Sequence, residues 1–306
     1  MQFESEYRLY RLRVFFRLLS LIVRSMRPAQ WTKNLLVFAG LVFAEKATDP
    51  ALIMRSLLAF AAFCLLSSGV YLLNDLIDAP NDRLHPLKKD RPVASGRLSR
   101  PAAATAATVV ACAGLLLASL VGGFFMPVGY IYFFINLLYS QWLKKLVIFD
   151  VMTVAIGMVL RVLGGTLAVG VQTSEWILIC TFLLSLFLAF GKRRHELVVL
   201  ENGATDHRGV LAHYSPYFLD QMIAVVTPST LICYILYTLS PDTVAHVGSR
   251  GLVFTVPFVI YGILRYLYLI HRRQGGGDPA ALLIRDPWLL AAVTGWLVVA
   301  FTVLYI

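Results

Sequence analysis

The residues best suited to chemistry lie between Tyr71 and Gly96, in the stretch YLLNDLIDAPNDRLHPLKKDRPVASG. An apolar run leads into four oxygen-bearing side chains, and a run of cations follows them. The oxygen-bearing residues are Asn74, Asp75, Asp78 and Asp82, and the cations are Arg83, Lys88, Lys89 and Arg91. A short group of acids can be a solvated helix end, but that interpretation does not account for the basic run. The order favours a site where a metal ion and phosphate groups bind together.

The spacing of three of these residues predicts a Mg²⁺ site. On a helix that continues through Asp78, the side chains of Asn74 and Asp78 lie one turn apart on one face. Asp82 lies one turn further, although Pro80 is expected to bend or end the helix first. Asp75 lies about 100° round the helix and is expected to face away. Mg²⁺ takes few carboxylates and shares its remaining coordination with water and phosphate, so Asn74, Asp78 and Asp82 are the predicted metal ligands.

The chain as a whole has the composition of an integral membrane protein. Of its 306 residues, 58% are hydrophobic and 14% are charged, and the mean hydropathy is +0.73. Most of nine apolar segments approach the roughly 20 residues that cross a bilayer, and in lipid such segments are expected to be helices. The segments lie near residues 35–45, 51–73, 102–121, 124–143, 147–170, 176–191, 217–240, 252–270 and 287–306. We predict an all-α fold with nine transmembrane helices.

The distribution of basic residues predicts the orientation of these helices. Twenty-two of the 27 Lys and Arg residues fall in the segments 1–34, 74–101, 144–145, 192–216 and 271–286. These segments alternate with connections that hold almost none, so they are expected in the cytoplasm. The predicted protein is multi-pass in the inner (plasma) membrane, with its N-terminus inside, its C-terminus outside and its active site facing the cytoplasm. The net charge of +10 fits these loops and an anionic substrate, and it needs no nucleic acid.

Residues 1–34 are predicted to form an N-terminal segment on the membrane surface. Arginines at positions 8, 11, 13, 17 and 24 are mixed with Leu, Phe and Tyr, as in an interfacial amphipathic helix. Residues 35–306 are then one transmembrane domain. Cytoplasmic loops near 79–100, 141–150 and 192–216 are expected to cap it, and the first has the length and Pro/Gly content of an ordered cap over a site.

Further polar side chains lie near the same membrane face. The segment 27–34, RPAQWTKN, offers Gln30, Lys33 and Asn34, for which a ligand role and a plain interfacial role are equally open. Asp150 and Arg161 share a helical stripe, with Arg161 about 16 Å deeper in the membrane. An Arg at that depth is costly unless it faces a polar cavity or a carboxylate, and we favour the cavity.

Several classes of protein are not supported by the sequence. It contains no Walker motif, no dinucleotide fingerprint and no HExxH pair. The four cysteines lie singly in apolar segments, without the spacing of a zinc site. No stretch has the composition of a soluble domain, and a homo-oligomer is compatible with what remains.

Together these residues resemble the UbiA superfamily of intramembrane prenyltransferases. The general resemblance rests on NDLID followed by DRLHPLKKDRPVASG and covers nearly the whole chain. A narrower one rests on RPAQWTKNLLVFAG, YSQWLKK followed by Asp150, GMVLRVLGG and GKRRHEL. That set is similar to the branch that transfers phosphoribose onto a polyprenyl phosphate. The resemblance implies nine helices around a cavity that faces the cytoplasm.

The chain departs from ordinary superfamily members in its second acidic motif. Members that ionise an allylic diphosphate usually carry a DxxxD motif, whereas the loop KKLVIFD has two lysines and a single acid, Asp150. This favours a donor that carries an additional phosphate. Phosphoribosyl pyrophosphate fits, because it has a 5-phosphate as well as its pyrophosphate.

The resemblance implies a Mg²⁺-dependent transfer of 5-phosphoribose from phosphoribosyl pyrophosphate to a decaprenyl-type polyprenyl phosphate, with release of pyrophosphate. Mg²⁺ on the three predicted ligands would neutralise the leaving group. The acceptor is already ionised and needs no general base, while Asp150 is the acid left to act as a nucleophile if a covalent intermediate forms. The branch is associated with arabinan precursors of the cell envelope. The candidate substrate-binding residues are Gln30, Lys33, Asn34, Arg83, Lys88, Arg91, Tyr139, Lys144, Arg161 and Lys192.

Two other functions stay open at this point. A prenyltransferase that moves an isoprenoid from its diphosphate to an aromatic or other small acceptor would use the same metal site. A lipid-phosphate transporter or binding protein would need the cations but has no use for metal-type acids beneath a loop cap. We therefore rank the transporter last.

Overall fold

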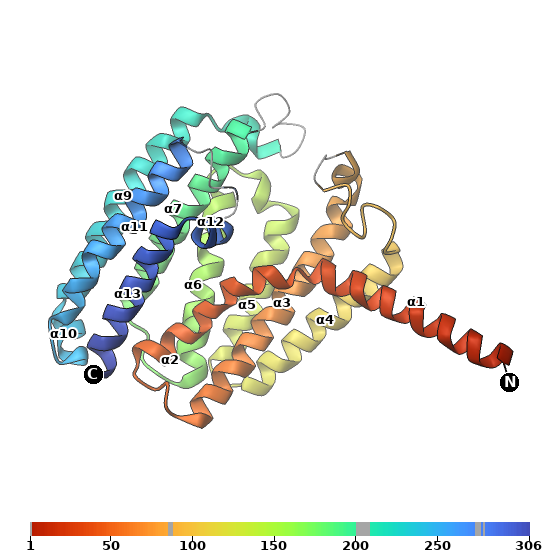
Figure 1. The fold of residues 1–306 in the computed structure, drawn as a ribbon, viewed down its shortest axis with the longest axis horizontal. Coiled ribbons are helices and arrows are strands. Elements are labelled where there is room, and N and C mark those ends of the chain that lie inside the picture. Colours follow the sequence, from red (N-terminus) through yellow and green to blue (C-terminus); the bar gives the residue numbers. More distant parts are fainter. Residues whose placement is uncertain (1, 85–87, 200–208, 273–276, 278) are drawn as a thin grey trace.

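The computed structural model describes residues 2–84, 88–199, 209–272, 277 and 279–306, and within these ranges every regular element is a helix (Figure 1). The α-helices are α1 (Gln2–Met26), α2 (Ala39–Phe43), α3 (Pro50–Leu84), α4 (Arg100–Val121), α5 (Phe125–Gln141), α6 (Phe149–Val169), α7 (Glu175–Val199), α9 (Pro216–Leu239), α10 (Pro241–Val247), α11 (Val256–Arg272), α12 (Pro279–Arg285) and α13 (Pro287–Tyr305). Four 3₁₀ helices connect them, η1 (Pro28–Phe38), η2 (Leu143–Lys145), η3 (Gly209–His213) and η4 (Gly251–Thr255). The expected all-α fold is confirmed.

Seven helical stretches of the described chain are long and apolar enough to cross a membrane. They correspond to seven of the nine expected segments. The other two are shorter: residues 35–45 form the end of η1 and the five-residue α2, and α5 has 17 residues. The chain is thus a multi-pass membrane protein, while the number of nine crossings and the placement of the termini stay predictions.

Helix α3 carries the acidic residues, and it is longer than the sequence predicts. It was expected to bend or end at Pro80, but it continues to Leu84 with Pro80 inside it. A proline removes one backbone hydrogen bond from a helix, and here the helix accommodates that loss at an exposed position near its C-terminal end. As a result Asp75, Asp78 and Asp82 all lie on one continuous helix.

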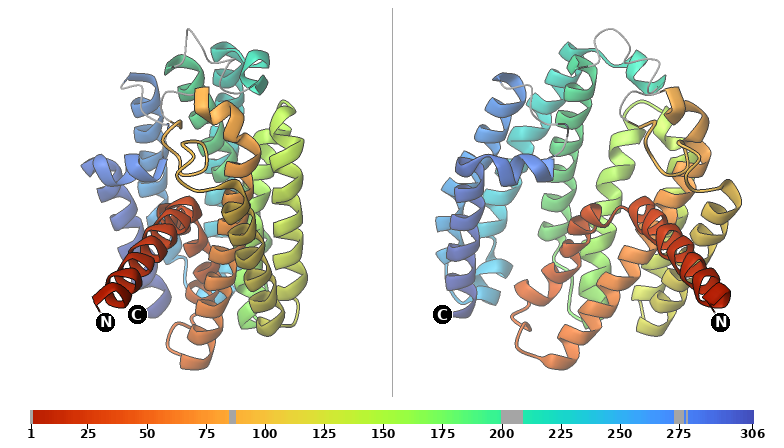
Figure 2. Two further views of the ribbon diagram at one scale, coloured as in Figure 1. Left: turned by 90° about the vertical axis from the view of Figure 1, so that its right-hand side faces the viewer. Right: turned by 45° about the vertical axis from the view of Figure 1, so that its right-hand side comes forward.

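Helix α6 stands between two groups of helices (Figures 1 and 2), with α3, α4 and α5 on one side and α7, α9, α11 and α13 on the other. Each group has its own apolar core. Val151 and Ala155 of α6 belong to the core built with α7, α9 and α11. Leu160 and Ala168, further along α6, belong to the core built with α3, α4 and α5. The position of α6 is therefore fixed from both sides by burial of apolar surface.

A close backbone approach fixes η1 and α2 against α6. A Cβ atom added to Gly165 would lie 1.9 Å from the carbonyl oxygen of Val37, and one added to Gly40 would lie 2.7 Å from Thr166 Cγ2. Small residues at such crossings let helices pack closely within a membrane. This contact holds the first polar segment, residues 28–34, against the centre of the bundle.

The connections rich in Lys and Arg gather at one end of the molecule. The loop after α3, the start of α6, the end of α7 and the start of α9 lie at the upper end in Figures 1 and 2, whereas α10 and the C-terminus lie at the opposite end. Helix α1 leaves the bundle and extends to one side (Figure 1), and its residues 10–20 are exposed. Its placement on the membrane surface stays a prediction.

The orientation can be tested with single cysteines in a background that lacks the four native ones. We expect Asp90→Cys to react with an impermeant maleimide only after the cells are opened, because residue 90 lies in a basic loop. Ile306→Cys is expected to react in intact cells. Labelling of both positions in intact cells would contradict the nine-crossing topology.

The packing of η1 against α6 can be tested with Gly165→Ala. The new methyl group would meet a carbonyl oxygen that cannot move independently of the backbone, so we expect a loss of about 1–3 kcal/mol in the free energy of unfolding. Gly157→Ala is the matched control in the same helix, because its Cβ would approach no atom closer than 3.5 Å. Equal thermal stability of the two variants in detergent would show that the close approach is not rigid.

Candidate active site

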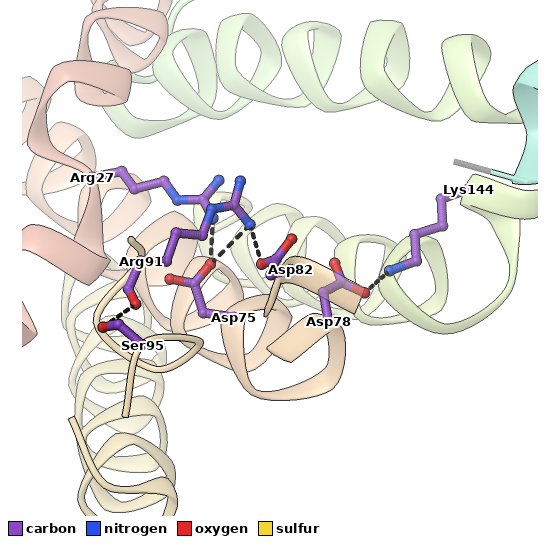
Figure 3. Close-up of polar contacts among 7 residues, drawn as sticks. All are labelled: Arg27, Asp75, Asp78, Asp82, Arg91, Ser95 and Lys144. Atoms are coloured by element: carbon purple, nitrogen blue, oxygen red, sulfur yellow. Dashed lines mark hydrogen bonds and ion pairs between the residues drawn. The ribbon is translucent and has the colours of Figure 1, made fainter. Parts of the chain in front are cut away.

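Two acids near the C-terminal end of α3 converge on the same arginine (Figure 3). Arg91 Nη1 donates to Asp82 Oδ2 at 2.6 Å and lies 3.5 Å from Asp75 Oδ1. Asp75 also accepts from Arg27, which turns the chain between α1 and η1 with a left-handed φ of 54°. Both carboxylates are buried, with side-chain exposures of 2% for Asp75 and 5% for Asp82. Buried charges of this kind are stable only when they are paired.

The third acid of α3 points to a different partner. Asp78 Oδ1 accepts from Lys144 Nζ at 2.7 Å, and Figure 3 shows this pair directed away from Arg91. Lys144 lies on η2, between α5 and α6, so the ion pair connects two segments that are 66 residues apart. The Asp78 side chain is 34% exposed and is therefore more accessible to an incoming ligand than its two neighbours.

Asn74 completes the group of polar side chains on α3. Its Oδ1 atom is buried and accepts no hydrogen bond from the residues that the structure describes. A buried amide oxygen without a donor costs free energy, and an oxygen aimed at a cation removes that cost. This orphaned oxygen one turn before Asp78 fits the predicted metal ligand.

The donor set fits Mg²⁺ bound together with phosphate better than a metal held by protein alone. Among the described residues, no three His, Cys, Asp or Glu side chains gather closely enough to hold a metal ion. Mg²⁺ binds commonly through one or two carboxylates and the oxygens of a phosphorylated substrate. Asn74, Asp78 and Asp82 could supply one amide and two carboxylates to such a site. In the structure Asp82 is paired with Arg91 and Asp78 with Lys144, so a bound metal would replace both ion pairs.

Asp150 lies in a separate cluster and is fully buried, with no exposed surface. Its Oδ2 accepts from Arg193 Nε at 2.7 Å, and its Oδ1 accepts from the hydroxyl of Tyr214 at 2.7 Å. Burial and the hydrogen bond to Asp150 raise the pKa of Tyr214, so its hydroxyl stays protonated and donates. Both carboxylate oxygens are thus engaged, and this arrangement does not favour Asp150 as a nucleophile.

Arg161 lies deep in α6 and bonds to neutral groups. Its guanidinium donates to Asn34 Oδ1 at 2.6 Å, to the Gly157 carbonyl at 2.7 Å and to the Tyr132 hydroxyl at 2.8 Å. The same guanidinium lies over the Tyr132 ring, 4.8 Å from its centroid, which adds a cation–π attraction. The Asn34 amide nitrogen donates to Cys64 Sγ at 3.2 Å. The structure therefore brings Asn34 to Arg161 rather than to the acids of α3.

The remaining candidate substrate-binding residues have different surroundings. Arg83 donates to the carbonyl of Ala94 at 3.1 Å, so it braces the loop after α3. The other candidates have partly buried side chains: Gln30, Lys33, Lys88, Tyr139 and Lys192.

Some residues of these clusters were not anticipated from the sequence. The expectation that Asp75 faces away is wrong in one respect, because Arg91 joins it to Asp82. The sequence did not single out Arg27 or Tyr214, and nothing in the residues beside them indicates an acidic partner 48 or 64 positions away. Arg193 was visible only as one of three consecutive cations.

Comparison of the chain with known protein families identifies the family to which it belongs. Residues 34–286 match the UbiA prenyltransferase family. The chain belongs to this family. It is therefore a membrane-embedded transferase, and its acids on α3 lie in the segment that carries the family resemblance.

Two curated relatives of this UbiA-family chain are decaprenyl-phosphate phosphoribosyltransferases. The one from Mycolicibacterium smegmatis is 31% identical over 92% of this chain and 91% of the relative. The one from Mycobacterium tuberculosis is 30% identical over 90% of this chain and 91% of the relative. Among solved structures, a UbiA homologue from Archaeoglobus fulgidus bound to GPP and Mg²⁺ aligns with a TM-score of 0.72 at 19% identity, covering 94% of this chain and all of that one. At that identity the likeness shows the fold.

The different surroundings of Asp75 and Asp78 predict different costs of removing them. Asp75→Ala removes the buried acid that pairs with Arg27 and lies near Arg91, so we expect a loss of about 1–3 kcal/mol in the free energy of unfolding. Asp78→Ala, on the same helix, removes a partly exposed pair and should cost less than about 1 kcal/mol. Thermal unfolding of the purified, substrate-free variants measures both. Equal losses would contradict the buried network around Asp75.

Proposed function

We propose that this UbiA-family protein transfers 5-phosphoribose from phosphoribosyl pyrophosphate to a polyprenyl phosphate of the decaprenyl type, with release of pyrophosphate. The reaction would take place at the cytoplasmic face of the plasma membrane. The named relatives support the pair of substrates. The observation that carries the proposal is the arrangement on α3, where a buried Asn74 oxygen without a hydrogen-bond donor among the described residues lies one turn before Asp78, and where Asp78 and Asp82 pair with cations from two other segments.

The residues of α3 would hold the metal, and the surrounding cations would hold the phosphates. Asn74, Asp78 and Asp82 are the proposed Mg²⁺ ligands, and bound Mg²⁺ would neutralise the charge of the departing pyrophosphate. Arg91 and Lys144 already lie against these acids, at 2.6 and 2.7 Å, so either can reach a phosphate bound to the same metal. A donor with three phosphate groups matches this supply of cations.

The transfer needs no proton acceptor from the protein. The bond between C1 of the ribose and the pyrophosphate oxygen breaks, and a bond from C1 to an oxygen of the lipid phosphate forms. The attacking oxygen is already ionised at neutral pH, so a general base would contribute nothing. This agrees with the engagement of both Asp150 oxygens by Arg193 and Tyr214, which leaves direct attack by the acceptor as the simpler route.

An ordinary prenyl transfer is the second candidate. It is favoured by the fold likeness to solved structures bound to GPP or to DMAPP with Mg²⁺. Against it stands the start of α6, where the single acid Asp150 is tied to Arg193. That acid is therefore poorly placed to hold a second metal ion on an allylic diphosphate.

The proposal can be tested with purified protein, Mg²⁺, polyprenyl phosphate and phosphoribosyl pyrophosphate labelled in the ribose. We expect label in the lipid fraction and its loss when Mg²⁺ is chelated. Asp78→Ala should reduce the rate by at least about 100-fold, the scale at which a group that stabilises transition-state charge acts. Asp90→Ala, an exposed acid in the neighbouring loop, is the matched control and should retain activity.

Three outcomes separate the candidate functions. Label in the lipid supports phosphoribosyl transfer. Transfer of an isoprenoid from its diphosphate to a small aromatic acceptor, without label in the lipid, would replace the proposal with prenyl transfer. Movement of lipid phosphate across vesicles without any product would make the protein a transporter.

A further inference from the structure

The segment that carries Lys144 has an unusual backbone. After α5 ends at Gln141, η2 brings Lys144 to Asp78, and the chain then turns into α6 through Ile148. Ile148 has a φ of 68°, in the left-handed region. A β-branched residue rarely adopts this conformation, so contacts from elsewhere must hold it.

Tyr214 supplies such a contact. Its hydroxyl accepts a hydrogen bond from the Ile148 amide at 2.7 Å and donates one to Asp150 Oδ1 at 2.7 Å. The side chain is buried, and its ring stacks on Phe218 with a centroid distance of 6.0 Å. One hydroxyl group therefore fixes both the turn at Ile148 and the carboxylate that begins α6.

Asp150 extends this contact to a third element. Its second oxygen accepts from Arg193 of α7, and Arg193 also pairs with Glu196 at 2.7 Å. Lys192, another candidate for binding phosphate, is the residue next to Arg193. A single buried carboxylate thus joins α6, α7 and the segment 209–215, close in sequence to two of the candidate cations.

We propose that Asp150, Arg193 and Tyr214 form a positioning triad that holds Lys144 at Asp78, and that Tyr214 in this way sets the affinity for the donor. The inference rests on the proposed function for the identity of the donor. A lysine side chain is long and has many rotamers, so where its Nζ lies depends on how firmly its backbone is held. Tyr214 holds that backbone four residues after Lys144 without needing to touch the substrate.

Tyr214→Phe is the direct test, because it removes one oxygen and keeps the buried ring. We expect the KM for phosphoribosyl pyrophosphate to rise by about fivefold to tenfold, the scale of one lost hydrogen bond, with a smaller change in kcat. Tyr217→Phe is the matched control: this tyrosine lies three residues further on, is 75% exposed, and should change neither constant.

A double-mutant cycle separates positioning from general stabilisation. If Tyr214 acts through Lys144, Tyr214→Phe should change kcat/KM little further once Lys144→Met is present. Two effects that multiply independently would overturn the proposal. Lys145→Met, which removes an exposed neighbouring cation, should leave the full effect of Tyr214→Phe in place.

A second readout does not depend on any substrate. In the Tyr214→Phe variant, we expect faster hydrogen exchange of the Ile148 amide. We also expect faster acetylation of Lys144 by an acylating reagent that reacts with amines. Both are followed by mass spectrometry in the purified full-length protein. Unchanged protection at both positions would overturn the triad. If the wild-type protein does not transfer phosphoribose, the proposed function fails, but these two measurements still decide whether Tyr214 holds Lys144.

Discussion

Charge balance at the C-terminal end of α3 is the constraint on which this end of the molecule depends. Three carboxylates within two helical turns repel one another, and two of them are almost wholly buried. Their partners come from three other segments: Arg27 after α1, Arg91 from the loop after α3, and Lys144 from η2. The fold of these segments is therefore tied to the acids, most strongly at Arg91, because removing it would take from the buried Asp82 the only ion-pair partner that the described residues give it.

Helix α6 connects several of the segments that carry polar side chains. Its first turn holds Asp150, which anchors α7 and the segment 209–215. Its middle holds Arg161, whose guanidinium donates hydrogen bonds to neutral acceptors on η1 and α5. Its C-terminal half presents Gly165 to the backbone of η1. One helix thus helps to set the positions of several segments that supply polar side chains to the candidate site.

The sequence predicted those features that depend on local composition and spacing. Apolar segment lengths gave seven of the spans, and the pattern from Asn74 to Asp82 gave a cluster of acids beside cations. Pairings between distant segments were not predictable, because each of Arg27–Asp75, Lys144–Asp78 and Asp150–Tyr214 is decided by how helices pack. The continuation of α3 through Pro80 was missed because tertiary packing outweighed a local helix-breaking preference.

The same balance explains why a donor that carries both a metal ion and phosphate suits this site. Mg²⁺ alone would approach carboxylates beside which Arg91 and Lys144 already lie, and the like charges would oppose its binding. A diphosphate alone would compete with Asp78 and Asp82 for those cations and leave the acids without partners. A metal–diphosphate complex supplies positive and negative charge together. Each ion pair can then be replaced by a carboxylate–metal contact and a cation–phosphate contact. If Mg²⁺ binds here as proposed, the arrangement favours the complex over either of its parts, because each carboxylate and each cation then keeps a partner of opposite charge.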